Sequence, residues 1–98
     1  MQIKEFLTYI KSERRYSSYT YISYRRDLLQ FQKFLKTNFD VSNDNEIRFE
    51  MIRSWVALLL DSKNSVSTVN RKISTLRSYF KYLITFTTIK KNPIIKLV

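Results

Sequence analysis

The segment Ser67–Leu83, STVNRKISTLRSYFKYL, decides the fold because its two sides differ in chemistry. At ~100° per residue around a helix axis, its apolar residues gather into one arc, spaced 4, 3, 4 and 3 apart: Val69, Ile73, Leu76, Phe80 and Leu83. Such an arc is typical of a helix that buries one face against a core. We therefore expect an amphipathic helix, capped by Ser67 and ending near Ile84.

The opposite arc of this helix is polar and contains Ser67, Asn70, Arg71, Ser74, Ser78, Lys81 and Tyr82. Thr75 lies beside this arc, and Lys72 lies nearer the core edge, where its stem would be buried and its ammonium would reach water. Ser and Thr weaken helix propensity relative to Ala or Glu, so a face made only for solubility does not explain them. Small hydroxyl side chains with Arg suit a helix in a DNA groove, where they can donate to phosphates and base edges.

Three further amphipathic helices are expected before this segment. Residues 2–13 and roughly 18–37 form the first two, the second capped by Ser17 or Ser18. Phe49–Asp61 forms the third. Their apolar stripes are Ile3, Phe6, Leu7 and Ile10; Tyr24, Leu28, Phe31, Phe34 and Leu35; and Ile52, Trp55, Val56, Leu59 and Leu60.

The segments between these helices read as connections. Arg14-Arg15-Tyr16 is a connector, residues 38–46 (NFDVSNDNE) form the clearest loop, and residues 62–65 break the helical pattern. Asp27 is most simply a local charge partner of the adjacent Arg26. No strand pattern competes with the helices, so the expected fold is all-α, a compact four-helix bundle.

Composition limits the possible functions. The 98 residues are enough for one small core, and no apolar run exceeds six residues, so no membrane span is expected. The charged N-terminus argues against a secretory signal, and a cytoplasmic location fits the absence of cysteine. The chain also lacks glycine and histidine, which excludes Gly-rich phosphate loops, most transition-metal sites and the common nucleophile–base pairs. We expect no catalytic residues, cofactor, metal or small-molecule ligand.

The charge of the chain is large and unevenly placed. The net charge is +10, yet residues 1–61 hold ten Lys/Arg and all eight Asp/Glu, whereas residues 62–98 hold eight Lys/Arg and no acid. A one-sided positive field attracts polyanions, of which nucleic acid is the first candidate and an anionic membrane surface the second. A basic domain without such a partner stays open as the simplest alternative.

Several motifs, taken in order, resemble the N-terminal core-binding domain of Xer-type tyrosine recombinases and phage integrases. They are Phe6–Ile10 with Glu13, Arg14 and Ser17; Tyr24–Leu28 with Phe31, Phe34 and Leu35; Thr68–Leu83; and Asn92-Pro93. The resemblance implies a SAM-like four-helix bundle that clamps duplex DNA, with its second and fourth helices facing the major groove. It also implies a module over residues 1–91, with residues 92–98 starting a linker to an absent C-terminal catalytic domain.

The resemblance also implies site residues and partners. Together with the polar arc, it points to DNA contacts at Thr20, Arg25, Ser67, Thr68, Arg71, Lys72, Ser74, Thr75, Ser78 and Lys81. The implied partners are double-stranded DNA and, in the full-length protein, sister recombinase protomers. Family members cleave DNA with a tyrosine that arginines, a lysine and a histidine assist, and this constellation belongs to the second domain. None of the seven tyrosines here is therefore assigned as the nucleophile.

The sequence departs from the family in one respect and leaves two other functions open. Relatives often place a glycine after the first helix (here Arg15-Tyr16) and near the end of the fourth, so local turn geometry is in question. One alternative is a helical protein-interaction module that docks an acidic partner or a sister protomer. The other is a helix-turn-helix regulator, ranked last because the break of five or six residues, Ser62–Val66, exceeds the usual turn of ~3–4.

Overall fold

The computed structural model describes residues 1–13 and 16–97, and within them it contains four α-helices and no strand. The helices are α1 (Ile3–Ser12), α2 (Ser18–Phe39), α3 (Phe49–Asp61) and α4 (Val66–Phe86), and a short 3₁₀ turn, η1 (Asp44–Glu46), lies between α2 and α3. The expected all-α, four-helix fold is confirmed. The predicted connector at Arg14-Arg15 lies outside the described residues.

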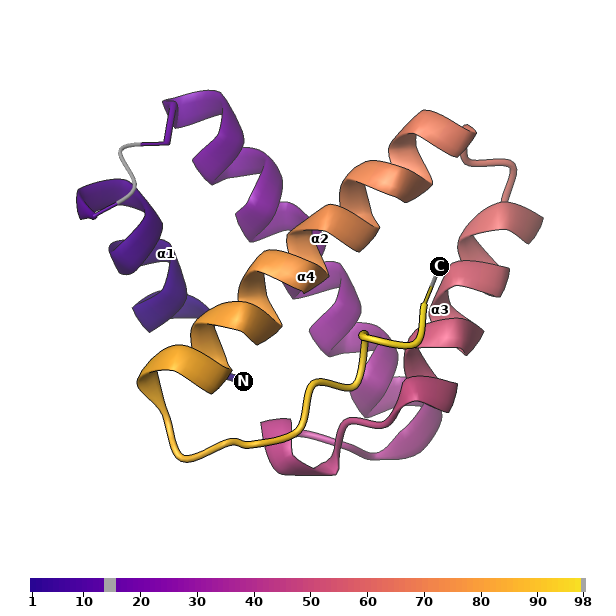
Figure 1. The fold of residues 1–98 in the computed structure, drawn as a ribbon. Helices are drawn as coiled ribbons and strands as arrows, with labels where there is room; N and C mark the ends of the chain where they lie inside the picture. The colour runs from indigo at the N-terminus through magenta and orange to yellow at the C-terminus, as the bar shows by residue number, and fades with distance from the viewer. Residues whose placement is uncertain (14–15, 98) are drawn as a thin grey trace.

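The two long helices, α2 and α4, cross near their middles (Figure 1). α1 packs against α2 on one side of the crossing, and α3 packs against both long helices on the other side. The N-terminal halves of α2 and α4 diverge from the crossing point (Figure 1). The fold therefore holds two helical arms at a fixed angle, with their N-terminal ends apart.

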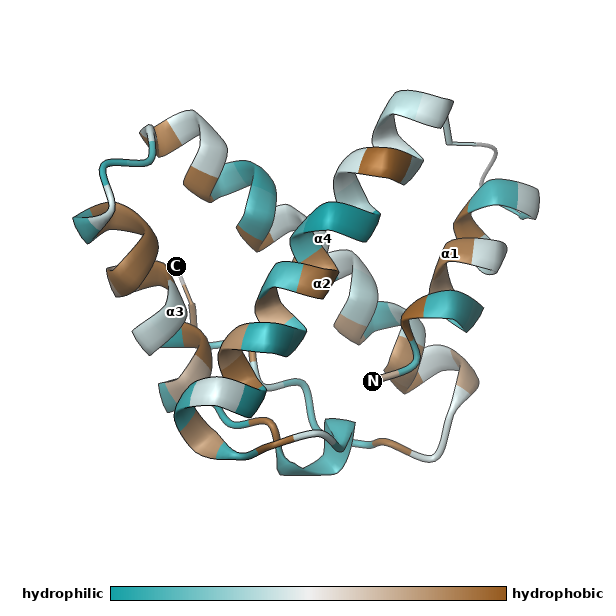
Figure 2. Ribbon diagram, turned by 180° about the vertical axis from the view of Figure 1, so that it is seen from behind, coloured by the Kyte–Doolittle hydropathy of each residue, from teal (hydrophilic) through white to brown (hydrophobic). Residues whose placement is uncertain are grey.

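The predicted apolar stripes lie in or against the core, with exceptions on α3. All four stripe residues of α1 are buried, as are Val69, Leu76, Phe80 and Leu83 of α4. On α3, Ile52 and Trp55 are buried, but Leu60 is 49% exposed. Leu60 lies ~140° around the helix from Trp55, so the stripe predicted for α3 was too wide. Figure 2 shows a hydrophobic stretch along α3, and two of its leucines, Leu58 and Leu60, are about half exposed.

Both long helices begin with the same capping arrangement. Ser17 caps α2 by accepting a 3.1 Å hydrogen bond from the Thr20 amide, and Ser65 caps α4 by accepting one of 3.1 Å from the Thr68 amide. The prediction of Ser67 as the cap of α4 was wrong by two residues. Ser65 and Ser67 are equally suitable caps by residue type. The extended backbone at Ser65 identifies it as the cap of α4. α3 and α4 are thus joined by four residues, 62–65.

Among the described residues of this glycine-free chain, two ordinary residues have left-handed backbone conformations. Asp40 has φ 53° after α2, and Lys63 has φ 64° after α3. Glycine is usual at such helix ends because a side chain makes this conformation costly. The turn questioned at Arg15-Tyr16 includes a residue outside the described ones.

The segment after α4 stays against the helical body. Ile94 is buried in the core, and the Arg77 guanidinium donates a 2.8 Å hydrogen bond to the Leu97 carbonyl. The chain therefore still packs on the bundle beyond Pro93. The boundary between residues 91 and 92 stays a prediction.

Candidate nucleic-acid interface

Asp27 of α2 is the centre of a polar cluster at the helix crossing. Its side chain is 0% exposed and faces α4. Arg71 donates to it twice, from Nε to Oδ2 at 3.2 Å and from Nη2 to Oδ1 at 2.8 Å. The Lys72 ammonium donates to Oδ1 at 2.9 Å, and the Thr75 hydroxyl donates to Oδ2 at 2.9 Å. We call these four residues the Asp27 cluster.

The cluster corrects three expectations from the sequence. The partner of Asp27 is not Arg26, because adjacent residues on a helix do not face each other. Lys72 is only 4% exposed, and its ammonium bonds Asp27 and Gln30 instead of reaching water. Thr75 is fully buried instead of lying beside an exposed arc, because α2 covers that side of α4.

The cluster places two cations on one carboxylate. Burial alone would raise the pKa of Asp27, but the hydrogen bonds from Arg71, Lys72 and Thr75 outweigh it and hold this pKa below its usual range. The hydrogen bonds to Asp27 also raise the pKa of Arg71. Within the cluster, the Arg71 side chain is 36% exposed and that of Lys72 only 5%. The excess positive charge therefore reaches the surface at Arg71.

Two of the predicted contact residues take part in the helix caps. The Thr20 hydroxyl lies 3.0 Å from the Ser17 hydroxyl, and Thr68 accepts a 3.0 Å hydrogen bond from the Ser65 hydroxyl. Both threonines are half-buried, each at the third residue of its helix. Ser67 and Ser74, by contrast, are exposed on α4.

Arg25 does not join the Asp27 cluster. It lies two residues from Asp27, ~200° around α2, so the two side chains leave the helix on nearly opposite sides. Arg25 and Arg26 instead line an open groove along α2 with Ile22, Leu29, Gln30 and Lys33.

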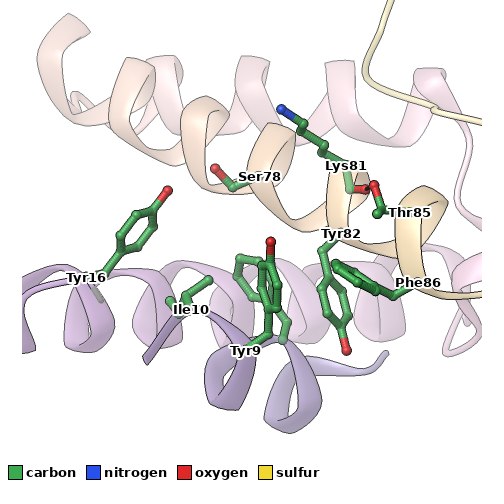
Figure 3. A pocket seen from close by; sticks show the side chains of 9 residues that line it. Tyr9, Ile10, Tyr16, Ser78, Lys81, Tyr82, Thr85 and Phe86 are labelled. Carbon is green, nitrogen blue, oxygen red and sulfur yellow. Dashed lines mark hydrogen bonds between the residues drawn. The ribbon is translucent and has the colours of Figure 1, made fainter. Parts of the chain in front are cut away.

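Ser78 and Lys81 line a separate aromatic cleft of about 310 Å³ between α1 and the C-terminal half of α4. Five aromatic side chains line this cleft, Phe6, Tyr9, Tyr16, Tyr82 and Phe86. The Tyr9 ring centroid lies 5.1 Å from that of Tyr82 and 4.9 Å from that of Phe86. Figure 3 shows Ser78 and Lys81 on α4 and Tyr9 on the facing side of the cleft. The structure thus divides eight of the predicted contacts between the Asp27 cluster, two helix caps, the α2 groove and this cleft, and Ser67 and Ser74 are exposed on α4 outside all four.

A family model described as the phage integrase N-terminal SAM-like domain matches residues 3–85. The chain belongs to this family. The resemblance inferred from the sequence motifs is therefore confirmed, and it covers all four helices of this SAM-like domain almost completely.

Relatives of this SAM-like domain are bacterial tyrosine recombinases. It is 33% identical to tyrosine recombinase XerD of Rickettsia bellii over 97% of the chain, and 37% identical to XerD of Rickettsia prowazekii, also over 97%. It is 37% identical to tyrosine recombinase XerC of Listeria welshimeri over 92% of the chain. The chain spans about 30% of the length of each of these relatives. No solved structure matches it.

Sequence reasoning missed the role of two residues in this SAM-like domain, Asp27 and Gln30. The available signal was the position of Asp27, which lies between Tyr24 and Leu28 on the apolar stripe of α2. A carboxylate at such a position requires buried partners.

The described helices include none with an apolar stretch of the length needed to span a membrane.

Proposed function

We propose that this SAM-like domain binds double-stranded DNA as a module of a site-specific tyrosine recombinase, through α2 and α4. The observation that carries the proposal is the Asp27 cluster, where an arginine with a partly exposed guanidinium is held beside exposed Ser67 and Ser74. The tyrosine recombinases among its relatives support the same function.

The charge of the chain supports a phosphate-dominated affinity. Its net charge is +10, and residues 62–98, which include α4, contain no acid. Each neutralised phosphate releases counterions and contributes a slope of about −0.9 to log K against log salt. We therefore expect binding that weakens steeply with salt, with sequence preference added by α4.

The proposed contacts follow exposure. Lys72 and Thr75 are buried and act on DNA through Asp27 and Arg71. The side chains that we propose to touch DNA directly are exposed or half-buried: Thr20, Arg25, Ser67, Thr68, Arg71, Ser74, Ser78 and Lys81.

The remaining functions of the recombinase belong to other parts of the protein. We propose that residues 1–91 are the DNA-binding module and that residues 92–98 lead toward a catalytic domain. Strand cleavage would take place in that domain, because this chain contains no histidine to assist a tyrosine nucleophile. Assembly with sister protomers on DNA and a cytoplasmic location complete the proposal.

The test is a fluorescence-anisotropy titration of a labelled 30-base-pair mixed-sequence duplex at several salt concentrations. We expect weak binding that falls with salt, and a further loss of about tenfold for Arg71→Ala, in line with ~1–3 kcal/mol for a well-formed arginine contact. Ser74→Ala should cost less, because it removes a single neutral donor. Arg53→Ala on α3 is the matched control, since Arg53 is exposed and the charge change is the same. Absence of binding at low salt, or equal losses for Arg71→Ala and Arg53→Ala, would overturn the proposal.

A protein-interaction module is the second candidate, and the aromatic cleft favours it. The cleft places Tyr9, Tyr82 and Phe86 beside the cationic Lys81, a combination that suits a partner with acidic and apolar groups. Salt-sensitive binding to an acidic protein or a second copy, without DNA affinity, would favour this function.

The helix-turn-helix alternative is ranked last for a different reason than the sequence suggested. The connection between α3 and α4 has four residues, 62–65, so the expected length was wrong and no longer argues against this motif. The family argues against it instead, because the relatives are tyrosine recombinases.

A further inference from the structure

We propose that Asp27 is a positioning residue for DNA binding: from its buried place it holds one edge of the Arg71 guanidinium and directs the opposite edge toward the DNA. Asp27 touches no DNA itself in this proposal. The inference rests on the proposed function, because it assigns a role to Asp27 within the same surface.

The hydrogen-bond geometry leaves a usable edge on Arg71. A guanidinium has five N–H donors in a rigid plane, and Asp27 takes Nε–H and one N–H of Nη2. The two hydrogens of Nη1 and the second hydrogen of Nη2 point away from the carboxylate. The pair at the tip of the guanidinium matches two adjacent acceptors, such as phosphate oxygens or the O6 and N7 atoms of guanine.

The position of Asp27 is fixed independently of Arg71. Lys72 and Thr75 each bond one of its carboxylate oxygens, and Leu28 and Phe31 in the adjoining turn of α2 are fully buried. The carboxylate therefore has little freedom to rotate. Because Lys72 neutralises its charge from within the protein, Arg71 retains its positive charge toward an anionic ligand.

Pre-orientation of Arg71 lowers the entropic cost of binding, because the side chain is already ordered before DNA arrives. A purely electrostatic role for Asp27 predicts the opposite effect, since removing a negative charge near the surface should tighten DNA binding. The sign of the change in affinity therefore separates the two roles.

The experiment is a double-mutant cycle of Asp27→Asn and Arg71→Ala, measured by anisotropy with the same 30-base-pair duplex at low salt. We expect Asp27→Asn to weaken binding about tenfold and to have almost no effect in the Arg71→Ala background. Asp61→Asn, at an exposed site on α3, is the matched control for charge and should leave binding unchanged or slightly tighter. Circular dichroism selects a temperature at which every variant is folded.

Each outcome bears on one proposal or on both. If wild type fails to bind, both the proposed function and the role of Asp27 are overturned. If wild type binds and Arg71→Ala weakens it, but Asp27→Asn tightens binding or its loss persists in the Arg71→Ala background, only the role of Asp27 is overturned.

A second measurement uses the wild-type chain and does not depend on the stability of any variant. The ¹⁵N relaxation of the Arg71 Nε–H group, without DNA, should be as restrained as that of the α4 backbone. Arg53, an exposed arginine on α3 of the same chain, is the internal reference, and its side chain should be mobile. Equal mobility of the two Nε–H groups would overturn the proposal.

Discussion

Asp27 and Asp44 both meet α4 from another element, yet their surroundings are opposite. Asp27 accepts hydrogen bonds from two cations and a hydroxyl at the helix crossing. Asp44 of η1 accepts from the Tyr79 hydroxyl, at 2.9 Å to Oδ1 and 3.1 Å to Oδ2. The Tyr79 oxygen in turn accepts from the Gln2 amide at 2.7 Å.

The pKa values of the two carboxyls consequently shift in opposite directions. Burial raises the pKa of Asp44, and the hydrogen bond from Tyr79 offsets this only in part. The cationic donors outweigh burial at Asp27 and lower its pKa. The comparison teaches that this small domain concentrates buried charge at the proposed DNA surface, whereas the contact that joins η1 and the N-terminal segment to α4 uses a neutral donor.

The largest expected effect follows from Asp27→Asn. This change leaves the buried Lys72 ammonium without a counter-charge, and breaking a buried ion pair on one side costs about 3–5 kcal/mol. Water can solvate the partly exposed Arg71 side chain once its carboxylate partner is gone, so we expect a loss near the lower end, about 3 kcal/mol in the free energy of unfolding. Guanidinium denaturation at pH 7 measures it, with Asp61→Asn as the exposed control. A loss below about 1 kcal/mol would contradict the electrostatic account of the cluster, given the usual range of single mutations.

The next effect is smaller because the groups at Asp44 include a neutral donor. Tyr79→Phe removes the hydroxyl that bonds Asp44 and Gln2, and it should lower the free energy of unfolding by about 1–2 kcal/mol, the cost of leaving partly buried polar groups unpaired. Urea denaturation is suitable here, with Tyr19→Phe as control because Tyr19 is 78% exposed. Equal behaviour of the two variants would show that the hydroxyl contributes nothing.

The smallest expected effect is the pH dependence of stability, and its sign differs between Asp27 and Asp44. Both carboxyls have the same ordinary pKa of 3.8. The pKa of Asp27 is lower in the folded state, so its contribution is present above pH 3.8 and is lost as the pH falls through the folded value. The pKa of Asp44 is higher in the folded state, so its ionisation costs stability as the pH rises from 3.8 through the folded value.

Asp44→Asn should therefore be neutral or stabilising by a few tenths of a kcal/mol at pH 7, and this gain should disappear near pH 3, where Asp44 of the wild type is protonated. The Asp27→Asn variant should be less stable than the wild type at pH 7, and this difference in the free energy of unfolding should also become smaller toward low pH. Thermal unfolding of both variants and wild type between pH 2.5 and 7 measures the two trends. Trends of the same sign would remove the distinction between the two regions.

The helices of this domain were predictable from the sequence because apolar spacing reports which side of each helix is buried. α3 was predicted with the bounds that the structure has, and α2 and α4 continue two residues past the predicted ends. The positions of Lys72 and Thr75 were not predictable in the same way. A helical wheel treats each helix alone, and only the crossing of α2 over α4 determines that these two polar side chains are covered.

The site was predictable as a surface but not as a network. The polar arc of α4 correctly included exposed Ser67 and Ser74. The pairing of Asp27 with Arg71 joins residues 44 positions apart in the sequence, and no local rule connects them. One part of the network could have been predicted. An acid on an apolar stripe requires a buried partner, and residues 62–98 offer eight cations with no acid of their own to pair with.

The crossing of α2 and α4 also has a geometric consequence for any ligand held between the two arms. Four hydrogen bonds meet on one carboxylate at this point, and sliding either helix by one residue would displace its groups by ~1.5 Å along the axis and rotate them by ~100°. The network therefore fixes the register of the two helices. The crossing therefore sets the separation between their capped ends, Ser17 and Ser65, and a duplex that contacts both ends, as proposed, would have to match this separation.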